Sequence, residues 1–325
     1  MKQPTPRFAF LIHPLVPLHR RILAARRLHV PGMLAKDAGV DLVGPGALVR
    51  MPTAVGDVEG LIIGVPDLPA QIIGDQSRAL ALMLRATRSA EAHGAQVIGL
   101  ANALGVVAGR GSELQRHTSL PVTSGQASTA WACTEVTRAM LVKRGTPRGP
   151  VAVFGFTGTV GDAVATLLAS EGVDVRVEAG GPALARRADA VGVKAMEREE
   201  LLATCDVLVG ASTTGPVLAP SQLRANTALV DLALPPTLEP GRLPPGFVRV
   251  PGEALYVPAR VQAGFWGRLW LLFAGYGSGR VYACFAEPAV IALTGERSFS
   301  QGRRLDPARV RAVGLALRHL GFRAV

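Results

Sequence analysis

The chain has 325 residues, 49% of them hydrophobic and 18% charged, which suits two domains with large buried cores and excludes extensive disorder. Its net charge of +11 favours acidic partners, but 5% aromatic residues and the lack of a nucleic-acid-binding motif argue against nucleic acid. The three cysteines and six histidines show neither a disulfide framework nor metal-ligand spacing, so we predict no metal site.

The first apolar run, Phe8–Leu18, has the composition of a leader peptide or the start of a membrane span. His13 and Pro14 interrupt it, and both this run and Trp266–Ala274 fall short of the roughly 20 apolar residues of a span. We therefore predict a buried first strand in a cytoplasmic protein with no transmembrane segment, and leave peripheral membrane contact open.

The N-terminal part of the chain alternates between strand and helix patterns. Phe8–Ile12, Gly60–Gly64 and Val97–Leu100 predict strands. Between them, Ser77–Ala92 has apolar residues at helical spacing and is stopped by His93-Gly94. Such alternation is typical of α/β architecture.

A glycine-rich turn follows the segment Gly145–Pro150, which predicts a domain boundary after a long helix that starts near Thr123. Val151–Phe154 predicts a short strand and Asp162–Glu171 a helix, joined by the sequence GFTGTVG from Gly155. The glycines of such a turn permit a tight bend, close approach of a phosphate and packing of the helix on the strand. This context predicts a dinucleotide-binding site, and the alternative is a glycine-rich connection without a ligand.

Beyond the turn, strands of a parallel, Rossmann-like sheet are predicted at Val173–Val177, Cys205–Val209 and Thr227–Leu232. The end of the first of these bears on the choice of nucleotide. Glu178 would accept a hydrogen bond from a free ribose 2′-OH and favour NAD, whereas Arg176, Arg186 and Arg187 would meet the 2′-phosphate of NADP. Spacing alone leaves this choice open.

The C-terminal part predicts a helix over Arg280–Leu293, despite Pro288, and a last helix over Pro307–Leu320. In the first of these helices, Arg280 precedes Cys284 by one turn and Glu287 follows it by one turn, so the three would share a face. A nearby cation lowers the pKa of a thiol and raises the fraction of reactive thiolate. The residues leave two hypotheses open, a nucleophile and a buried cysteine that acts as a small hydrophobe.

Several motifs in a common order resemble the long-chain acyl-[acyl-carrier-protein] reductases best known from cyanobacteria, whose cofactor domain is related to shikimate dehydrogenase-like enzymes. The most specific is ACFAE at Ala283–Glu287, followed by HLGFR at His319–Arg323. The others, in chain order, are FAFLIHPL, EAHGAQVIGLANALG, TSGQASTA, VAVFGFTGTVGDAVATLL, CDVLVGAST and LVDLALPP. The resemblance implies an α/β fold with a Rossmann-like parallel-sheet cofactor domain and an α/β substrate domain.

The resemblance also implies an activity, the NAD(P)H-dependent reduction of a long-chain acyl thioester to a fatty aldehyde. Cys284 would attack the thioester to form an acyl-enzyme, and NADPH would deliver the hydride that releases the aldehyde. Glu287 would orient or protonate groups in the site, with a helix-surface carboxylate as the alternative. NADP(H) is the expected cofactor, with NAD(H) as the alternative.

Site residues and partners follow from the glycine turn, the strand spacing and the same resemblance. The expected cofactor contacts are Gly155, Thr157, Gly158, Thr159, Val160, Gly161, Arg176, Glu178, Ala211 and Ser212. The expected substrate contacts are Asn102, Ser124, Gly125 and Gln126. The acyl donor would be acyl carrier protein or acyl-CoA, and a downstream aldehyde-using enzyme would take the product. An arginine-rich segment that would suit an acidic carrier protein contains Arg20, Arg21, Arg26 and Arg27.

Three departures from the family concern the residues expected to contact the substrate and the cofactor. Ala101–Gly105 replaces a serine-bearing turn, with Asn102 as the substitute for the missing hydroxyl. Glu178-Ala179 stands where the family has Arg-Asn, which weakens the expected NADP preference, and Gly275–Gly279 also differs.

The expected domains are an α/β substrate and partner-binding domain (1–125), a connecting helix and linker (126–148), a Rossmann dinucleotide-binding domain (149–250) and a C-terminal segment (251–325) that carries the cysteine helix and packs back on the substrate domain. Two other functions stay open. One is a shikimate dehydrogenase-like alcohol or amino-acid dehydrogenase, for which Lys143 and Lys194 are poor acid–base candidates. The other is a non-catalytic dinucleotide-binding protein.

Overall fold

The computed structural model describes residues 5–14, 43–212, 215–233, 235–265, 267–268, 277, 279–296, 299–300 and 302–324. The chain divides into two compact units. The first comprises Met1–Ser128, Leu255–Arg303 and Leu315–Arg323, and the second comprises Thr129–Ala254, Arg304–Gly314 and Ala324–Val325. The arginine-rich segment at 20–27 and most of the apolar stretch at 266–274 lie outside the described residues.

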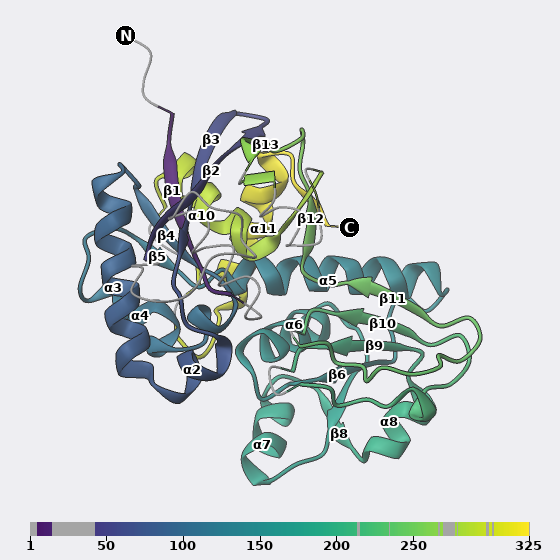
Figure 1. Ribbon diagram of the computed structural model, residues 1–325. Helices are drawn as coiled ribbons and strands as arrows, with labels where there is room; N and C mark the ends of the chain where they lie inside the picture. Colours follow the sequence, from purple (N-terminus) through teal and green to yellow (C-terminus); the bar gives the residue numbers. More distant parts are fainter. Residues whose placement is uncertain are drawn as a thin grey trace. The chain divides into compact units, whose positions relative to one another are not determined.

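The first unit is built on a six-stranded sheet in the order β13-β2-β3-β1-β4-β5 (Figure 1). Its strands are β1 (Arg7–Ile12), β2 (Gly44–Thr53), β3 (Gly56–Gly64), β4 (Val97–Leu100), β5 (Val122–Thr123) and β13 (Gln262–Ala263). The four strands β3, β1, β4 and β5 run parallel, whereas β2 pairs antiparallel with both β3 and β13. The predicted first strand is therefore buried in the middle of this sheet.

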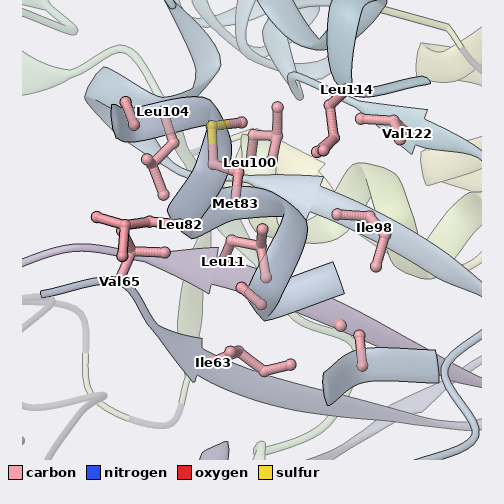
Figure 2. Close-up of a cluster of buried hydrophobic side chains, with 14 of the residues drawn as sticks. Leu11, Ile63, Val65, Leu82, Met83, Ile98, Leu100, Leu104, Leu114 and Val122 are labelled. Carbon is pink, nitrogen blue, oxygen red and sulfur yellow. The ribbon is translucent and has the colours of Figure 1, made fainter. Parts of the chain in front are cut away.

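One face of this sheet is covered by α2 (Pro69–Gly74) and α3 (Gln76–Ala92). Figure 2 shows the resulting core, in which Leu11 and Ile63 from the strands lie in the same cluster as Met83 from α3. The shorter elements of this unit are η2 (Asn102–Gly105), η3 (Ala108–Gly111) and α4 (Ser112–Gln115). Their buried residues Leu104 and Leu114 join the same core.

The other face is covered by α10 (Ala283–Thr294). Phe285 stacks edge-on against Phe8 and Phe10, with ring centroids 5.2 and 5.0 Å apart. Glycines in the strands allow this close packing: a Cβ at Gly60 would lie 3.2 Å from the Phe285 ring, and one at Gly99 would lie 2.7 Å from Pro288. The cysteine helix is thereby fixed against the centre of the sheet.

The second unit contains a six-stranded, fully parallel sheet in the order β11-β10-β9-β6-β7-β8 (Figure 1). Its strands are β6 (Val151–Phe154), β7 (Val175–Glu178), β8 (Lys194–Met196), β9 (Val207–Gly210), β10 (Ala228–Asp231) and β11 (Val248–Pro251). Its connections include α6 (Thr159–Ser170), α7 (Pro182–Ala190), α8 (Arg198–Thr204) and η4 (Pro220–Gln222). Counted from β6 as the first strand, this order is 3-2-1-4-5-6, the Rossmann arrangement.

The remaining elements are α5 (Gln126–Lys143), α11 (Pro307–His319) and a three-stranded sheet of β14 (Arg280–Tyr282), β12 (Ala254–Tyr256) and β15 (Arg323–Ala324). The predicted α/β class with a Rossmann-like parallel sheet is confirmed. The helix predicted from Arg280 is wrong at its start, because Arg280–Tyr282 form a strand and the helix begins at Ala283. None of the described helices is both long and apolar enough to cross a membrane.

Candidate functional site

The glycine turn in the second unit joins the end of β6 to the start of α6. Gly155 has a φ of +88°, and a Cβ there would lie 2.6 Å from the carbonyl oxygen of Ala211. A Cβ at Gly161 would lie 2.2 Å from the carbonyl oxygen of Gly155. Both positions therefore accept only glycine, because a side chain would collide with the backbone. At Gly155 the positive φ is a second reason.

Gly158 differs from the other two glycines, because a Cβ there would come no nearer than 3.2 Å to another atom. It is the N-cap of α6, and no side chain caps that helix end. The start of an α-helix presents backbone N–H groups and a partial positive charge. A residue without a side chain at this N-cap leaves room for a phosphate to approach.

The structure brings the turn together with two other predicted cofactor residues. The Cβ position of Gly155 lies 2.6 Å from Ala211 and 2.8 Å from the amide nitrogen of Ser212, just beyond β9. Thr157 is exposed at the tip of the turn, Thr159 is buried and Val160 is half-buried. These residues follow the carboxyl ends of neighbouring parallel strands, where ligands of Rossmann sheets bind.

The end of β7 carries an ion pair that spacing did not indicate. Arg198, the first residue of α8, donates from Nε and Nη2 to the two carboxylate oxygens of Glu178, each at 2.8 Å. Its Nη1 donates to the Val217 carbonyl at 2.6 Å. The hydrogen bonds to Glu178 raise the pKa of Arg198. The negative charge of Glu178 is therefore paired with the positive charge of Arg198.

Two of the three arginines that were considered for a 2′-phosphate have other partners, and the third, Arg186, is exposed. Arg176 donates to Asp174, at 3.1 and 2.7 Å, and to Thr204 at 2.8 Å. Arg187 holds both carboxylate oxygens of Asp162 at 2.5 and 2.7 Å. Arg198 was missed because only the fold brings it to Glu178, 20 residues earlier in the chain.

The three cysteines, all within the described residues, differ in exposure. Cys133 and Cys205 are buried, with 0% and 1% of their surface exposed, whereas Cys284 is partly exposed. Burial raises the pKa of both buried thiols, which keeps them protonated and unreactive. Of the three cysteines, Cys284 is therefore the one that is partly open to solvent.

Cys284 is the second residue of α10, with Tyr282 as the N-cap. A thiol in the first turn of a helix lies at the positive end of the helix dipole, which favours its thiolate. The expected place of Arg280 on the same helical face is wrong, since Arg280 belongs to β14.

Glu287, one turn further along α10, is fully buried, which corrects the alternative of a helix-surface carboxylate. The Thr123 hydroxyl donates to its Oε1. Its Oε2 accepts from the Ser128 amide, the Ser128 hydroxyl and the Ser300 hydroxyl, each at 2.9 Å. The described donors on Glu287 thus come from two segments of the chain, 123–128 and Ser300, and no cation is among them. We call these residues the Glu287 cluster.

The Glu287 cluster holds the predicted substrate segment against the cysteine helix. Gly125 has a φ of +68°, and a Cβ there would lie 2.4 Å from the Cβ of Cys284. The Gly125 amide donates to the Thr123 hydroxyl at 3.2 Å. The Ser124 amide donates to the Ser300 carbonyl at 3.2 Å. Gly125 is therefore placed at Cys284 by its backbone, and the preceding Ser124 is held by Ser300.

The other two predicted substrate residues lie on the side of η2. Gln126 donates from Nε2 to the Gly105 carbonyl at 3.3 Å, and its Oε1 is buried with no hydrogen-bond partner among the described residues. Asn102 is exposed with a φ of +49° at the start of η2. Buried His13 anchors this turn by accepting the Ala103 amide on Nε2 at 3.2 Å. The described residues contain no cluster that could hold a metal ion.

Comparison with models of known protein families finds no match. The chain is 24% identical over 292 residues to a protein named aminotransferase PigE from Serratia sp. (strain ATCC 39006), which covers 81% of this chain and 32% of that protein. It therefore spans about a third of the length of that relative.

Among solved structures, the chain resembles shikimate 5-dehydrogenase (AroE) from Thermus thermophilus in complex with NADP(H) and shikimate, at 16% identity over 97% of this chain and 100% of that one, with a TM-score of 0.42. It also resembles one of the subunits of dipicolinate synthase from Bacillus halodurans, at 14% identity over 72% and 84% of the two chains, with a TM-score of 0.34. At these TM-scores the likeness supports no conclusion about the activity of this chain. The chain's own strand order and glycine turn define a Rossmann-type α/β protein.

Proposed function

We propose that this chain is an NAD(P)H-dependent oxidoreductase that reduces an acyl thioester to an aldehyde through an acyl-Cys284 intermediate. The observation that carries the proposal is the placement of Cys284, the partly exposed cysteine, in the first turn of α10 against the Gly125 backbone. The resemblance of ACFAE to the acyl-carrier-protein reductases supplies the reaction type.

The first half of the reaction needs only this chain and the donor. The Cys284 thiolate adds to the thioester carbonyl, the carbon–sulfur bond to the carrier breaks, and the carrier leaves as a thiol after taking up a proton. One thioester replaces another, so the exchange is close to balanced in free energy, and the acyl group is then held on the enzyme. Bound NAD(P)H would supply a hydride to the acyl carbon, releasing the aldehyde and the Cys284 thiolate.

The residues of the glycine turn fit such a cofactor. Gly158 leaves space at the N-terminus of α6, which suits a pyrophosphate, and Glu178 with Arg198 lies where the adenosine ribose binds in Rossmann sheets. Because Arg198 neutralises Glu178, a 2′-phosphate would not meet an uncompensated carboxylate there. We therefore favour NADP(H), with NAD(H) as the alternative.

The acyl donor in this proposal is acyl carrier protein or acyl-CoA, and the aldehyde passes to a second enzyme. The relative named as an aminotransferase supports the second point, because an aldehyde is a carbonyl compound that an aminotransferase can aminate. This chain matches about a third of that protein, so the match would be to a part that supplies the carbonyl.

The test is mass spectrometry of the protein after incubation with a long-chain acyl-CoA or acyl carrier protein, without cofactor. We expect one acyl adduct on Cys284, and aldehyde only after NADPH is added. Cys284→Ser should abolish aldehyde formation, whereas the buried-site control Cys205→Ser should retain it. If Cys284 stays unmodified although the protein is saturated with the acyl donor, the proposal would be overturned.

The same experiment separates the other two functions. A shikimate dehydrogenase-like enzyme would keep its rate in Cys284→Ser. Its lysine candidates have little support, because Lys143 is exposed at the end of α5 and Lys194 pairs with Asp174 at 3.0 Å. A non-catalytic protein would bind the dinucleotide in a calorimetric titration and form neither adduct nor product.

A further inference from the structure

Arg110 in η3 is held in a backbone conformation that arginine rarely adopts. Its φ is +57°, and the flanking Gly109 and Gly111 have φ values of +62° and +85°. The other two described residues besides glycine with positive φ are asparagines, which tolerate the left-handed region better. Strain of this kind persists where the surroundings enforce it, often at binding sites.

The surroundings of this loop do enforce the conformation. A Cβ at Gly111 would lie 3.2 Å from the Val122 side chain and 3.3 Å from that of Leu100, so the backbone runs against the core. On the other side, the Ser112 hydroxyl donates to the Gly109 carbonyl at 2.8 Å. Arg110 is therefore fixed at its backbone on both sides.

The guanidinium of Arg110 is only partly satisfied. Its Nε is buried and has no hydrogen-bond partner among the described residues, while the side chain as a whole is half-buried. Many other arginines in the described part of the chain pair with a carboxylate, as Arg198 does with Glu178. A guanidinium whose buried N–H donor has no partner is suited to bind an oxyanion, because an oxyanion can accept two parallel hydrogen bonds from it.

A second positive charge lies beside the first. Burial, followed by the charge of Arg303, lowers the pKa of Arg110. Two neighbouring cations attract an anion more strongly than one cation does. The pair thus provides the charge that a phosphate needs, and Arg303 is exposed to solvent.

This arginine pair adjoins the segments that carry the Glu287 cluster. Val122, against which Gly111 packs, directly precedes Thr123, and Arg303 follows Ser300 by three residues. Thr123 and Ser300 both donate to Glu287. An anion held by Arg110 would therefore belong to the molecule whose thioester reaches Cys284.

We propose that Arg110 and Arg303 form an oxyanion subsite for the phosphate of the phosphopantetheine arm, which acyl carrier protein and CoA share. This inference rests on the proposed function, since it assigns an end of the same substrate. The phosphate contributes binding energy remote from the reacting carbon. An acyl thioester that lacks this phosphate would then be a poor substrate.

The test compares two donors that differ by one phosphate, acyl-4′-phosphopantetheine and acyl-pantetheine. We expect kcat/KM to be at least tenfold higher for the phosphorylated donor, and Arg110→Asn to abolish this difference while leaving the pantetheine thioester unaffected. Asparagine suits the left-handed backbone, and Arg110→Gly relieves its strain altogether, so loss of folding is not a confounding factor. The control is Arg116→Gln, an exposed arginine in the same unit, which should keep the preference.

A binding measurement separates this inference from the proposed function. Calorimetry of Cys284→Ala with unacylated 4′-phosphopantetheine and with pantetheine needs no turnover, and tighter binding of the former would support the subsite even if no aldehyde forms. Acyl-CoA and acyl carrier protein are measured in the same way. The subsite serves the donor that loses more affinity when Arg110→Asn is introduced. If Arg110→Asn weakens the phosphorylated and the unphosphorylated donors equally, or weakens neither, the proposed subsite would be overturned.

Discussion

Gly125 lies directly against Cys284, and a Cβ at Gly125 would be 2.4 Å from the Cβ and 2.5 Å from the Cα of Cys284. The contact joins the start of α5 to the start of α10. Glu287 holds it in place, because its carboxylate binds donors on both sides of Gly125. The Cys284 side chain is therefore positioned by a close backbone contact, for which a methyl group at Gly125 would leave no room.

We expect Gly125→Ala to abolish acylation of Cys284 and to destabilise the protein. The left-handed φ costs alanine about 1–2 kcal/mol, and the collision with α10 adds about 1–3 kcal/mol. Gly145→Ala is the matched control, because its φ is +73° and nothing lies within 4 Å of its Cβ position. Urea unfolding and adduct mass spectrometry should show the backbone cost in both variants and lost acylation in Gly125→Ala alone. Equal behaviour of the two would refute the positioning role of Gly125.

Glu287→Gln should slow acylation of Cys284 while the protein stays folded. An amide keeps the volume but replaces one acceptor oxygen by a donor, which conflicts with the hydroxyls and the Ser128 amide around it. An unsatisfied buried donor costs about 1–3 kcal/mol. Glu287→Ala should be more damaging, because it leaves all the donors without an acceptor and opens a cavity.

The measurement is the rate of acyl transfer to Cys284 as a function of pH, together with urea unfolding. If Glu287 only stabilises the fold, both variants would lose unfolding free energy in order of severity and acylate at the wild-type rate per folded molecule. If it positions the Gly125 segment, the rate per folded molecule falls as well, and Gln recovers part of what Ala loses.

The parts of the fold that are local in sequence were predictable from the sequence. Strand β6 was predicted with its observed bounds, and the glycine turn lies where the spacing placed it, because strand, turn and helix are encoded within some twenty residues. The start of α10 was not predictable in this way. Arg280–Tyr282 continue the apolar pattern of the helix, and only pairing with β12 makes them a strand.

The surroundings of the candidate site residues depend on contacts that the sequence does not encode locally. Glu287 was paired in sequence with Cys284, but its partners Thr123 and Ser128 lie about 160 residues away. Its burial could not be inferred from a helix pattern in which a carboxylate ordinarily faces solvent. The same holds for Arg198, which no spacing rule connects to Glu178.

Arg198→Gln should change the choice of nucleotide. Removing the guanidinium leaves the Glu178 carboxylate uncompensated at the end of β7, where it would repel a 2′-phosphate and accept a hydrogen bond from a free 2′-OH. We expect the Kd for NADPH to rise at least tenfold relative to that for NADH. Titration calorimetry checks this, with Arg176→Gln as the control, because Arg176 is held by Asp174. A parallel change for both nucleotides would assign Arg198 a structural role only.

His13 should make the stability of the protein depend on pH. Burial lowers the pKa of His13 below 6.5, and its Nε2 must be unprotonated to accept the Ala103 amide. The unfolded chain therefore takes up a proton at higher pH than the folded one. The stabilisation is complete above the unfolded-state pKa and is lost as pH falls through it, by up to about 1.4 kcal/mol per pH unit.

We expect urea unfolding of the wild-type protein to show a free energy that declines between pH 7 and pH 5, and His13→Gln to flatten this decline while lowering stability at pH 7. His93→Gln is the control, since His93 is exposed at the end of α3 and should leave the slope unchanged. A slope that persists in His13→Gln would move the pH dependence to another group. Because His13 anchors the turn that carries Asn102, loss of its hydrogen bond at low pH should also raise KM for the acyl donor before the protein unfolds.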